Sequence, residues 1–270
     1  MNIRLPALIV TLLVVAGGAL LLLEGSDKLR RTPPGTLRIG SVNLNAQNDR
    51  PTLASRALAR ADADIIVLQE WTGHNASVAI LRERGLDIVL SDARTGTHGT
   101  AILARPTLKV DSEIAPPPWQ GACAMPLATA FLRTRNHHVG LLGVHGPPPI
   151  SSCRPSRTPY LRAVAELVDH GKLRERVGAI PAGTPVILLG DLNALPWEDP
   201  IDELSGRGLV DGFDAGSWTL GLTWSPSEWL PPVARLDYVW VPQAWSVVAS
   251  QTLAVPGSDH EGVFVDVTTP

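Results

Sequence analysis

The sequence predicts an α/β domain built on mixed β-sheets, and two kinds of pattern lead to this fold class. Short apolar runs of strand-forming residues recur through most of the 270-residue chain, some in direct succession and others separated by amphipathic helical patterns. A purely parallel sheet would need a long crossover, usually a helix, between successive strands. Glycine and proline, at 24 residues each, add many turns and argue against a helix bundle.

The predicted elements can be assigned from these runs. Helical periodicity predicts a helix that begins at Pro51, a second over Ala76–Arg84 and a third over Tyr160–Val177. Because some strands follow one another without a helix between them, we expect mixed rather than parallel pairing. The predicted strands are Leu37–Asn43, Asp64–Gln69, Thr100–Ala104, Leu127–Leu132, Val139–His145, Val186–Leu189, Leu236–Val241, Trp245–Leu253 and Gly262–Val267.

An uncharged apolar run, Leu5–Leu23, precedes the predicted strands. As a helix this run would be about 28 Å long, close to the thickness of a bilayer core. The small residues around Gly17 would also suit a cleaved signal peptide, but Leu20–Leu23 extend the apolar run beyond them. We therefore expect residues 1–24 to form an N-terminal transmembrane helix that anchors the protein, residues 25–36 to be a linker, and residues 37–270 to form one catalytic domain.

The composition excludes several classes of protein. With 44% hydrophobic and 18% charged residues, the chain is not an intrinsically disordered protein. A net charge of −3 gives no overall positive field for the non-specific binding of nucleic acid. Two cysteines are too few for a disulfide-rich scaffold or a cysteine-rich zinc site.

The same two cysteines bear on the cellular compartment. Cys123 and Cys153 each lie in a turn-rich segment, which suits one disulfide in an oxidising compartment, although two unrelated thiols would give the same pattern. The Lys and Arg residues on either side of the apolar run would instead place the domain in the cytoplasm. We expect a monomeric, single-pass protein of the cell membrane with its domain on the extracytoplasmic side.

Polar residues stand at the ends of several predicted strands. Each of them alone is explained by a turn or a helix cap, but their joint occurrence in one domain indicates a catalytic site. Carboxylate and amide oxygens are the hard ligands that Mg²⁺ selects, and histidines then remain for proton transfer. The residues concerned are Asn43, Glu70, His145, Asp191, Asn193, Asp237, Asp259 and His260.

The order of these motifs resembles that of the endonuclease/exonuclease/phosphatase superfamily, which includes deoxyribonuclease I. The resemblance covers about residues 37–267 and implies a four-layer α-β-β-α sandwich, in which two mixed β-sheets pack together with helices outside. The matching blocks are IGSVNLN at 39–45, DIIVLQEWTG at 64–73, HGTAILARP at 98–106, GVHGPPP at 143–149, VILLGDLNALPWE at 186–198, RLDYVWV at 235–241 and SDH at 258–260.

The resemblance also implies a set of metal ligands. Glu70 would be the principal carboxylate ligand, with Asn43 beside it and Asp259 as a further carboxylate. Asn45 stands where some members of the superfamily have an acidic residue. The expected ion is Mg²⁺, with Mn²⁺ as a substitute.

The remaining residues of the blocks would carry out the hydrolysis. Asp191 would orient or deprotonate the attacking water, and Asn193 would position that water and the phosphate. His260 would contact the scissile phosphate, and His145 would donate a proton to the leaving oxygen. Asp237 would pair with a catalytic histidine, and the sequence leaves open which one.

Two further residues are candidates for substrate binding. His98 precedes a strand that runs close to the site in the superfamily, and Arg157 follows His145 where a loop and a helix start can hold a phosphate. For each residue taken singly, an ordinary loop position for His98 and a solvated helix entry for Arg157 are the simpler explanations.

Together these observations predict a metal-dependent hydrolase of phosphate esters. Basic residues, at 23, are outnumbered by 26 acidic ones, whereas proteins that bind polymeric DNA gain affinity from many Lys and Arg contacts. A membrane tether also raises the effective concentration of lipid substrates. We therefore expect a membrane-anchored phosphodiesterase or phosphatase that acts on a lipid or small-molecule phosphate. The alternatives are a nuclease acting on DNA or RNA and a catalytically inactive binding module of the same fold.

Overall fold

The computed structural model describes residues 33–133, 138–168, 172–173, 180–181, 183–227 and 229–269. The predicted membrane anchor, residues 1–24, and most of the predicted linker lie outside these residues. Within the described part of the chain, no helix is long and apolar enough to cross a membrane.

Two six-stranded mixed sheets pack face to face. Sheet A has the strand order β11-β12-β1-β2-β4-β3, and sheet B has the order β5-β6-β7-β8-β10-β9. The strands of sheet A are β1 (Leu37–Asn43), β2 (Ile65–Gln69), β3 (Asp87–Asp92), β4 (Thr100–Ala104), β11 (Ser246–Ala254) and β12 (Glu261–Thr268). Those of sheet B are β5 (Lys109–Ala115), β6 (Leu127–Arg133), β7 (His138–His145), β8 (Val186–Asp191), β9 (Leu209–Asp211) and β10 (Asp237–Pro242).

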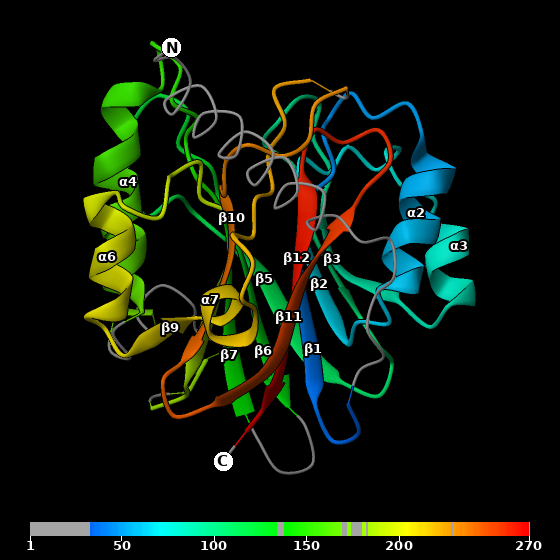
Figure 1. The fold of residues 1–270 in the computed structure, drawn as a ribbon. Coiled ribbons are helices and arrows are strands. Elements are labelled where there is room, and N and C mark those ends of the chain that lie inside the picture. The colour runs from blue at the N-terminus through cyan, green and yellow to red at the C-terminus, as the bar shows by residue number, and fades with distance from the viewer. Residues whose placement is uncertain are drawn as a thin grey trace, which may run out of the picture.

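Helices cover the outer faces of the two sheets, as Figure 1 shows. Helices α2 (Pro51–Arg60) and α3 (Val78–Glu83) lie outside sheet A, and α4 (Arg154–Leu167) and α6 (Asp199–Ser205) lie outside sheet B. The short helix α7 (Gly212–Gly216) packs against β10, β11 and β12. The predicted arrangement of two packed mixed sheets between helices is therefore confirmed.

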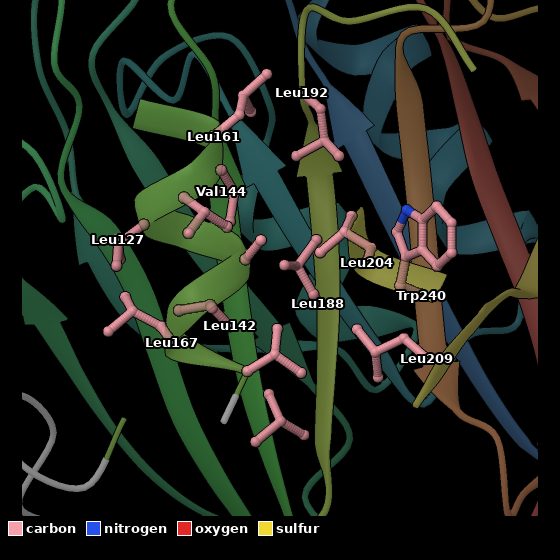
Figure 2. Close-up of a cluster of buried hydrophobic side chains, with 14 of the residues drawn as sticks. Leu127, Leu142, Val144, Leu161, Leu167, Leu188, Leu192, Leu204, Leu209 and Trp240 are labelled. Carbon is pink, nitrogen blue, oxygen red and sulfur yellow. The ribbon is translucent and has the colours of Figure 1, made fainter. Parts of the chain in front are cut away.

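The central strands are apolar along their whole length because both of their faces are covered. Leu188 of β8 and Val144 of β7 pack against Leu161 and Leu167 of α4 (Figure 2). The opposite face of β8 presents Ile187 to the core between the two sheets. Such two-sided burial produces the near-continuous apolar runs from which these strands were predicted.

Each sheet has a parallel pair at its centre, and these pairs position the polar residues. The pairs are β1–β2 and β7–β8. The carboxyl ends of parallel strands lie at the same edge of a sheet. Strand β12 runs antiparallel to β1, and β10 runs antiparallel to β8, so both begin at that edge. Polar residues at six strand ends are thereby brought to one edge of the sandwich.

Some elements differ from the prediction. Helix α4 begins at Arg154 and ends at Leu167, whereas the prediction placed it at Tyr160–Val177. Pro155 lies in the first turn, where a missing N–H costs little because N–H groups there have no helical acceptor, and Pro159 lies further inside the helix. Strands β3, β5 and β9 and helices α6 and α7 were not predicted. All three strands lie at sheet edges, where partial exposure, as in β3 and β5, weakens the apolar signal. Strand β9 and the two helices are short.

The predicted disulfide is present. Cys123 and Cys153 are bridged, with 5.4 Å between their Cα atoms. Cys153 is the residue that precedes α4, so the bridge ties the segment before β6 to the start of this helix. It thereby restrains the loop that follows β7 and His145.

Candidate active site

The carboxyl ends of β1 and β2 place two predicted metal ligands side by side. Asn43 is in register with Gln69, and Glu70 follows with a φ of 56°, a left-handed backbone that is uncommon for this residue type. The side-chain amide of Asn43 donates to Oε1 of Glu70 over 3.2 Å, and the backbone N–H of Ala46 donates to Oε2 over 2.8 Å. The Glu70 carboxylate is thus oriented by two donors.

Sheet B contributes a row of three polar side chains. His145 is the register partner of Asp191, which is in turn the partner of Asp237 on the other side. Directly opposed residues project from the same face of a sheet, so the three side chains lie next to one another. A glycine must precede Asp191, because Gly190 has a φ of 151° and a Cβ there would lie 1.8 Å from the carbonyl oxygen of Val144.

Asn193 is fixed by its neighbours on the loop after β8. Its φ is 50°, and its backbone N–H donates to Oδ1 of Asp191 over 2.8 Å. Its side-chain amide donates to the carbonyl oxygen of Gly146 over 3.0 Å. Asn45 and Glu70 are also left-handed. Strained backbone of this kind is concentrated at functional sites, where the surrounding structure holds it in place.

His260 directly precedes β12, and its side chain pairs with that of Asp237. Its Nδ1 lies 2.8 Å from Oδ2 of Asp237, which answers the question that the sequence left open. Its Nε2 lies 3.8 Å from Oδ2 of Asp191, and Nε2 of His145 lies 3.6 Å from the same oxygen. Asp191 therefore lies between two imidazoles.

Burial sets the electrostatics of this cluster. Burial raises the pKa of Asp191 to about 6. Attraction from His260 and His145 lowers this pKa by less than burial raises it, and repulsion from the Asp237 carboxylate raises it further. Burial also disfavours the charged form of His260, but the carboxylates of Asp237 and Asp191 outweigh it and raise the pKa of His260 to about 10. The site thus combines a carboxylate with a near-neutral pKa and a cationic imidazole.

Two buried atoms of the site have no hydrogen-bond partner among the described residues. They are Nδ1 of His145 and Oδ1 of Asp237. Buried polar atoms without partners are rare in folded proteins and call for an explanation. For His145, contact of Nδ1 with a water or substrate molecule would explain the missing partner.

Carboxylate and amide side chains are linked by hydrogen bonds on the side of the site nearest β1 and β2. The Asn45 backbone N–H donates to Oδ1 of Asn43 over 3.0 Å, and its side-chain amide donates to Oδ1 of Asp259 over 3.0 Å. Glu70, Asn43, Asn45 and Asp259 therefore form one connected set of carboxylate and amide groups, which fits a hard cation such as Mg²⁺.

A second group could also be considered for a metal. One ligand atom each of Asp191, Asp237 and His260 lies within 4.8 Å of the others. However, Nδ1 of His260 is already engaged by Asp237 at 2.8 Å, which is the geometry of an oriented histidine–carboxylate pair. This pairing engages one nitrogen of His260, and the described residues offer two candidate metal positions, this buried group and the groups around Glu70.

The two predicted substrate-binding residues have different surroundings. His98 is exposed, but the partial desolvation of its ring lowers its pKa, and repulsion from His145 and Arg94 lowers it further. Glu70 acts in the opposite direction. These interactions place His98 at the margin of the site. Nε of Arg157, by contrast, donates to the carbonyl oxygen of Asn193 over 2.7 Å.

The guanidinium of Arg157 is further engaged by the carboxylate of Glu198, with which it forms an ion pair. Glu198 also accepts a hydrogen bond from the backbone N–H of Leu195 over 2.8 Å. Arg157 is thus bound to the loop that carries Asn193. These contacts favour a positioning role over the predicted contact with substrate.

The structure adds supporting residues that the sequence analysis did not assign to the site. The Asn75 side chain is buried and donates to the carbonyl oxygens of Glu70 (2.7 Å) and Asn45 (3.1 Å). The hydroxyl of Thr223 accepts from the backbone N–H of Asp237 over 3.2 Å. Nε1 of Trp224 donates to Oδ2 of Asp259 over 3.3 Å. Their only signal in the sequence is a polar or aromatic residue near a motif, which is too common to be informative.

Comparison with known proteins agrees with the fold. The structure is similar to that of an endonuclease/exonuclease/phosphatase family protein from Bacteroides thetaiotaomicron, with 18% identity, a TM-score of 0.67, and coverage of 89% of this chain and 97% of that chain. It is also similar to D. rerio TDP2 in complex with a single-strand DNA product (21% identity, TM-score 0.66, 87% and 99% covered). A third similar structure is a mannosyl-6-phosphatase from Bacteroides thetaiotaomicron (18% identity, TM-score 0.62, 86% and 99% covered).

At these identities the structural likeness shows the fold alone. A comparison of the sequence with curated proteins finds no match. The sequence itself supplies the family, because residues 40–260 match the endonuclease/exonuclease/phosphatase family, and this match includes every residue of the site from Asn43 to His260. The chain therefore belongs to the endonuclease/exonuclease/phosphatase family.

Proposed function

We propose that this protein is a divalent-metal-dependent hydrolase of phosphate esters. The observation that carries the proposal is the position of Asp191, which is buried between the imidazoles of His145 and His260 and accepts a hydrogen bond from the Asn43 amide that also donates to Glu70. A base, two proton-bearing groups and a cation site at one edge are the parts that such hydrolysis requires.

In this proposal Asp191 receives a proton from the attacking water. Its pKa of about 6 keeps it ionised at neutral pH and close enough to neutrality for proton transfer. The water oxygen forms a bond to phosphorus while the bond from phosphorus to the leaving oxygen breaks. His145 supplies the proton that the leaving oxygen needs, and Asn193 orients the phosphate.

The charge that develops on the phosphate is met by His260. Its pKa is raised to about 10, so the imidazole carries a positive charge at neutral pH, and the hydrogen bond to Asp237 fixes its orientation. Glu70, Asn43 and Asp259 would hold the divalent ion, which supplies Lewis-acid stabilisation of the phosphate oxygens when bound.

For the substrate we propose a lipid or small-molecule phosphate, with the protein anchored in the cell membrane by residues 1–24 and its domain on the extracytoplasmic side. The acidic balance of the chain, its apolar N-terminal run and the single disulfide support this choice. A nuclease is the second candidate, because TDP2, which has the same fold, is found with a single-strand DNA product.

The test measures hydrolysis by the full chain in detergent micelles, with Mg²⁺ or with EDTA. The substrates are a chromogenic phosphodiester, lipid phosphates in mixed micelles and plasmid DNA. We expect Mg²⁺-dependent release from the chromogenic substrate and from lipid. Asp191→Asn should be inactive, and Asp111→Asn, an exposed aspartate on β5, should serve as the matched active control.

Two results would contradict the proposal. If none of the three substrates is hydrolysed with Mg²⁺, the enzymatic activity is wrong. If plasmid is nicked rapidly at about 150 mM salt and no product is released from lipid, the choice of substrate class is wrong, because tight DNA binding at that salt concentration requires many phosphate contacts.

A further inference from the structure

The edge that carries the catalytic residues also carries large apolar side chains that are exposed to solvent. Trp229 is 85% exposed, and Trp197 is 73% exposed. Ile150, Leu230 and Val233 are each more than half exposed. We call these five residues the apolar rim. Clustered exposed apolar residues of this size are uncommon on soluble monomers unless they contact a partner or a membrane.

Three loops bring the rim to the catalytic edge. Strand β7 ends at His145, and Ile150 lies on the loop that follows it. Strand β8 ends at Asp191, and Trp197 lies on the loop that follows that strand. Parallel strands end at the same edge, so both loops leave the sandwich beside the site.

The third loop carries Trp229 and is attached directly to the catalytic histidine. Trp224 forms isolated β-bridges with Ala234 and with His260, and the backbone N–H of Val233 donates to the carbonyl oxygen of Trp224 over 2.8 Å. The chain after Trp224 therefore returns beside Trp224 at Ala234, and Trp224 is itself bridged to His260. In Figure 1 this segment, in gold and orange, rises to the edge at which β10 and β12 begin.

The rim loops carry almost no charge. Residues 146–153 and 192–197 contain no Asp, Glu, Lys or Arg, and residues 225–234 contain a single Glu. They are rich in proline and present aliphatic and indole groups. These stretches supply no Lys or Arg with which to neutralise the phosphates of a nucleic acid, and the exposed Arg154, at the start of α4, borders one of them. Tryptophan with aliphatic neighbours is instead the composition that enters the interface between lipid headgroups and acyl chains.

The chain also has the reach to bring this edge to a bilayer. The apolar run Leu5–Leu23 is predicted to lie in the membrane, and residues 25–36 connect it to β1. Twelve linker residues can span about 40 Å when extended, whereas the length of β1 is about 20 Å. The linker is therefore long enough for the far end of β1, where Asn43 lies, to face the bilayer.

We propose that the apolar rim docks on the surface of the lipid bilayer, with Trp197 and Trp229 in the interfacial layer, so that the catalytic edge faces the membrane. The proposal rests on the proposed function in that it explains how a lipid phosphate would reach Asp191. Because the rim loops lack basic residues, docking should depend on apolar burial and not on anionic lipids.

The test uses the tryptophan residues as reporters of lipid contact. The full chain has eight Trp, and none precedes Trp71, so the predicted anchor and linker contribute no signal. The protein is reconstituted in phosphatidylcholine vesicles with or without brominated acyl chains, which quench nearby indoles. We expect bromolipid quenching in the wild type. Because two Trp belong to the rim, Trp197→Ser or Trp229→Ser should each remove about half of it.

Trp218→Ser is the matched control, since Trp218 is 75% exposed but lies outside the rim. It should keep the quenching of the wild type, and quenching should persist from about 50 to 500 mM salt. The proposal is overturned if wild-type fluorescence is equal in the two kinds of vesicle, as it would be if the rim met a protein partner. It is also overturned if neither rim variant changes the quenching, or if salt abolishes it.

Hydrolysis of the soluble chromogenic phosphodiester separates this proposal from the proposed function. The rim variants should hydrolyse that substrate at the wild-type rate, because no rim side chain is assigned to the chemistry. A loss of that rate in Trp197→Ser and Trp229→Ser would make the rim part of the substrate site and would contradict docking. Quenching without hydrolysis by the wild type would leave docking intact and contradict the proposed function.

Discussion

The side chains of Asn43 and Asp191, which belong to different sheets, are joined by a hydrogen bond from Nδ2 of Asn43 to Oδ2 of Asp191 over 3.0 Å. Both residues are buried at the carboxyl ends of their strands. The same Asn43 amide donates to Glu70. One side chain therefore connects the proposed metal ligands of sheet A with the proposed base of sheet B and holds them at a fixed separation.

This relationship predicts that Asn43→Ala lowers kcat. Hydrogen bonds to charged groups contribute about 1.5–3 kcal/mol, so loss of this donor should cost about 10- to 100-fold in turnover. Steady-state kinetics on the chromogenic phosphodiester provides the measurement. Ser41→Ala removes another buried polar group from β1, away from the site, and should leave kcat near the wild-type value. Equal losses in both variants would indicate damage to the strand instead.

Glu70→Gln should shift the dependence of activity on Mg²⁺. An amide is a poorer ligand than a carboxylate, so half-maximal activity should require at least about tenfold more Mg²⁺. Initial rates measured over a range of Mg²⁺ concentrations give this value. Glu113→Gln, an exposed substitution on β5, provides the control and should behave as the wild type. Full activity of Glu70→Gln in EDTA would show that Glu70 is not a metal ligand.

The pair formed by His260 and Asp237 predicts a pH dependence of the metal-free protein. Because the pKa of His260 is raised to about 10, its folded form should hold a proton that the unfolded chain loses near pH 6.5. The stabilisation is then fully present below about pH 6.5 and is lost as the pH rises towards 10. Urea unfolding in EDTA across this range should show the decline.

Asp237→Asn should reduce that decline, because it removes the largest of the groups that raise the pKa of His260. An NMR titration of the His260 ring should show the lower pKa directly. A His260 ring that titrates near 6.5 in the wild type would mean that its interaction with Asp237 does not stabilise the charged form.

Much of the site could be predicted from the sequence because its residues stand at the ends of apolar strands. The runs that end at Asn43 and His145 are buried on both faces, so their boundaries with polar residues are sharp. The metal and catalytic roles came from the order of the motifs, and they remain predictions. The structure brings these side chains within hydrogen-bond or ion-pair distance, which is the condition for those roles.

What could not be predicted depends on contacts between distant segments. The partner of Asp237 follows from the approach of β10 and the start of β12 at one edge, and nothing local to Asp237 signals it. Asn75 resembles any polar loop residue until its amide is seen between two carbonyl groups of the site. Strand β5 was missed because three of its seven residues are exposed at the edge of sheet B.

The disulfide between Cys123 and Cys153 should contribute to stability. It joins cysteines that are 30 residues apart, and closing a loop of that length restricts the unfolded chain by about 3–4 kcal/mol. Reduction of the wild type should lower its free energy of unfolding by a similar amount. The double variant Cys123→Ser/Cys153→Ser should already have the lower value and should not respond to reductant. Two alkylatable thiols in protein isolated from the membrane would show that the bridge does not form in the cell.

Arg157 allows a positioning role to be distinguished from substrate binding. Its guanidinium holds the carbonyl oxygen of Asn193 and the carboxylate of Glu198. Arg157→Met should therefore displace the loop that carries Asn193 and lower kcat by about tenfold with little change in KM. A contact with substrate would instead raise KM. Arg162→Met is the matched control, because Arg162 also pairs with a glutamate, Glu203, but in an exposed position. Exposed pairs contribute little, so this variant should keep the kcat, the KM and the thermal stability of the wild type.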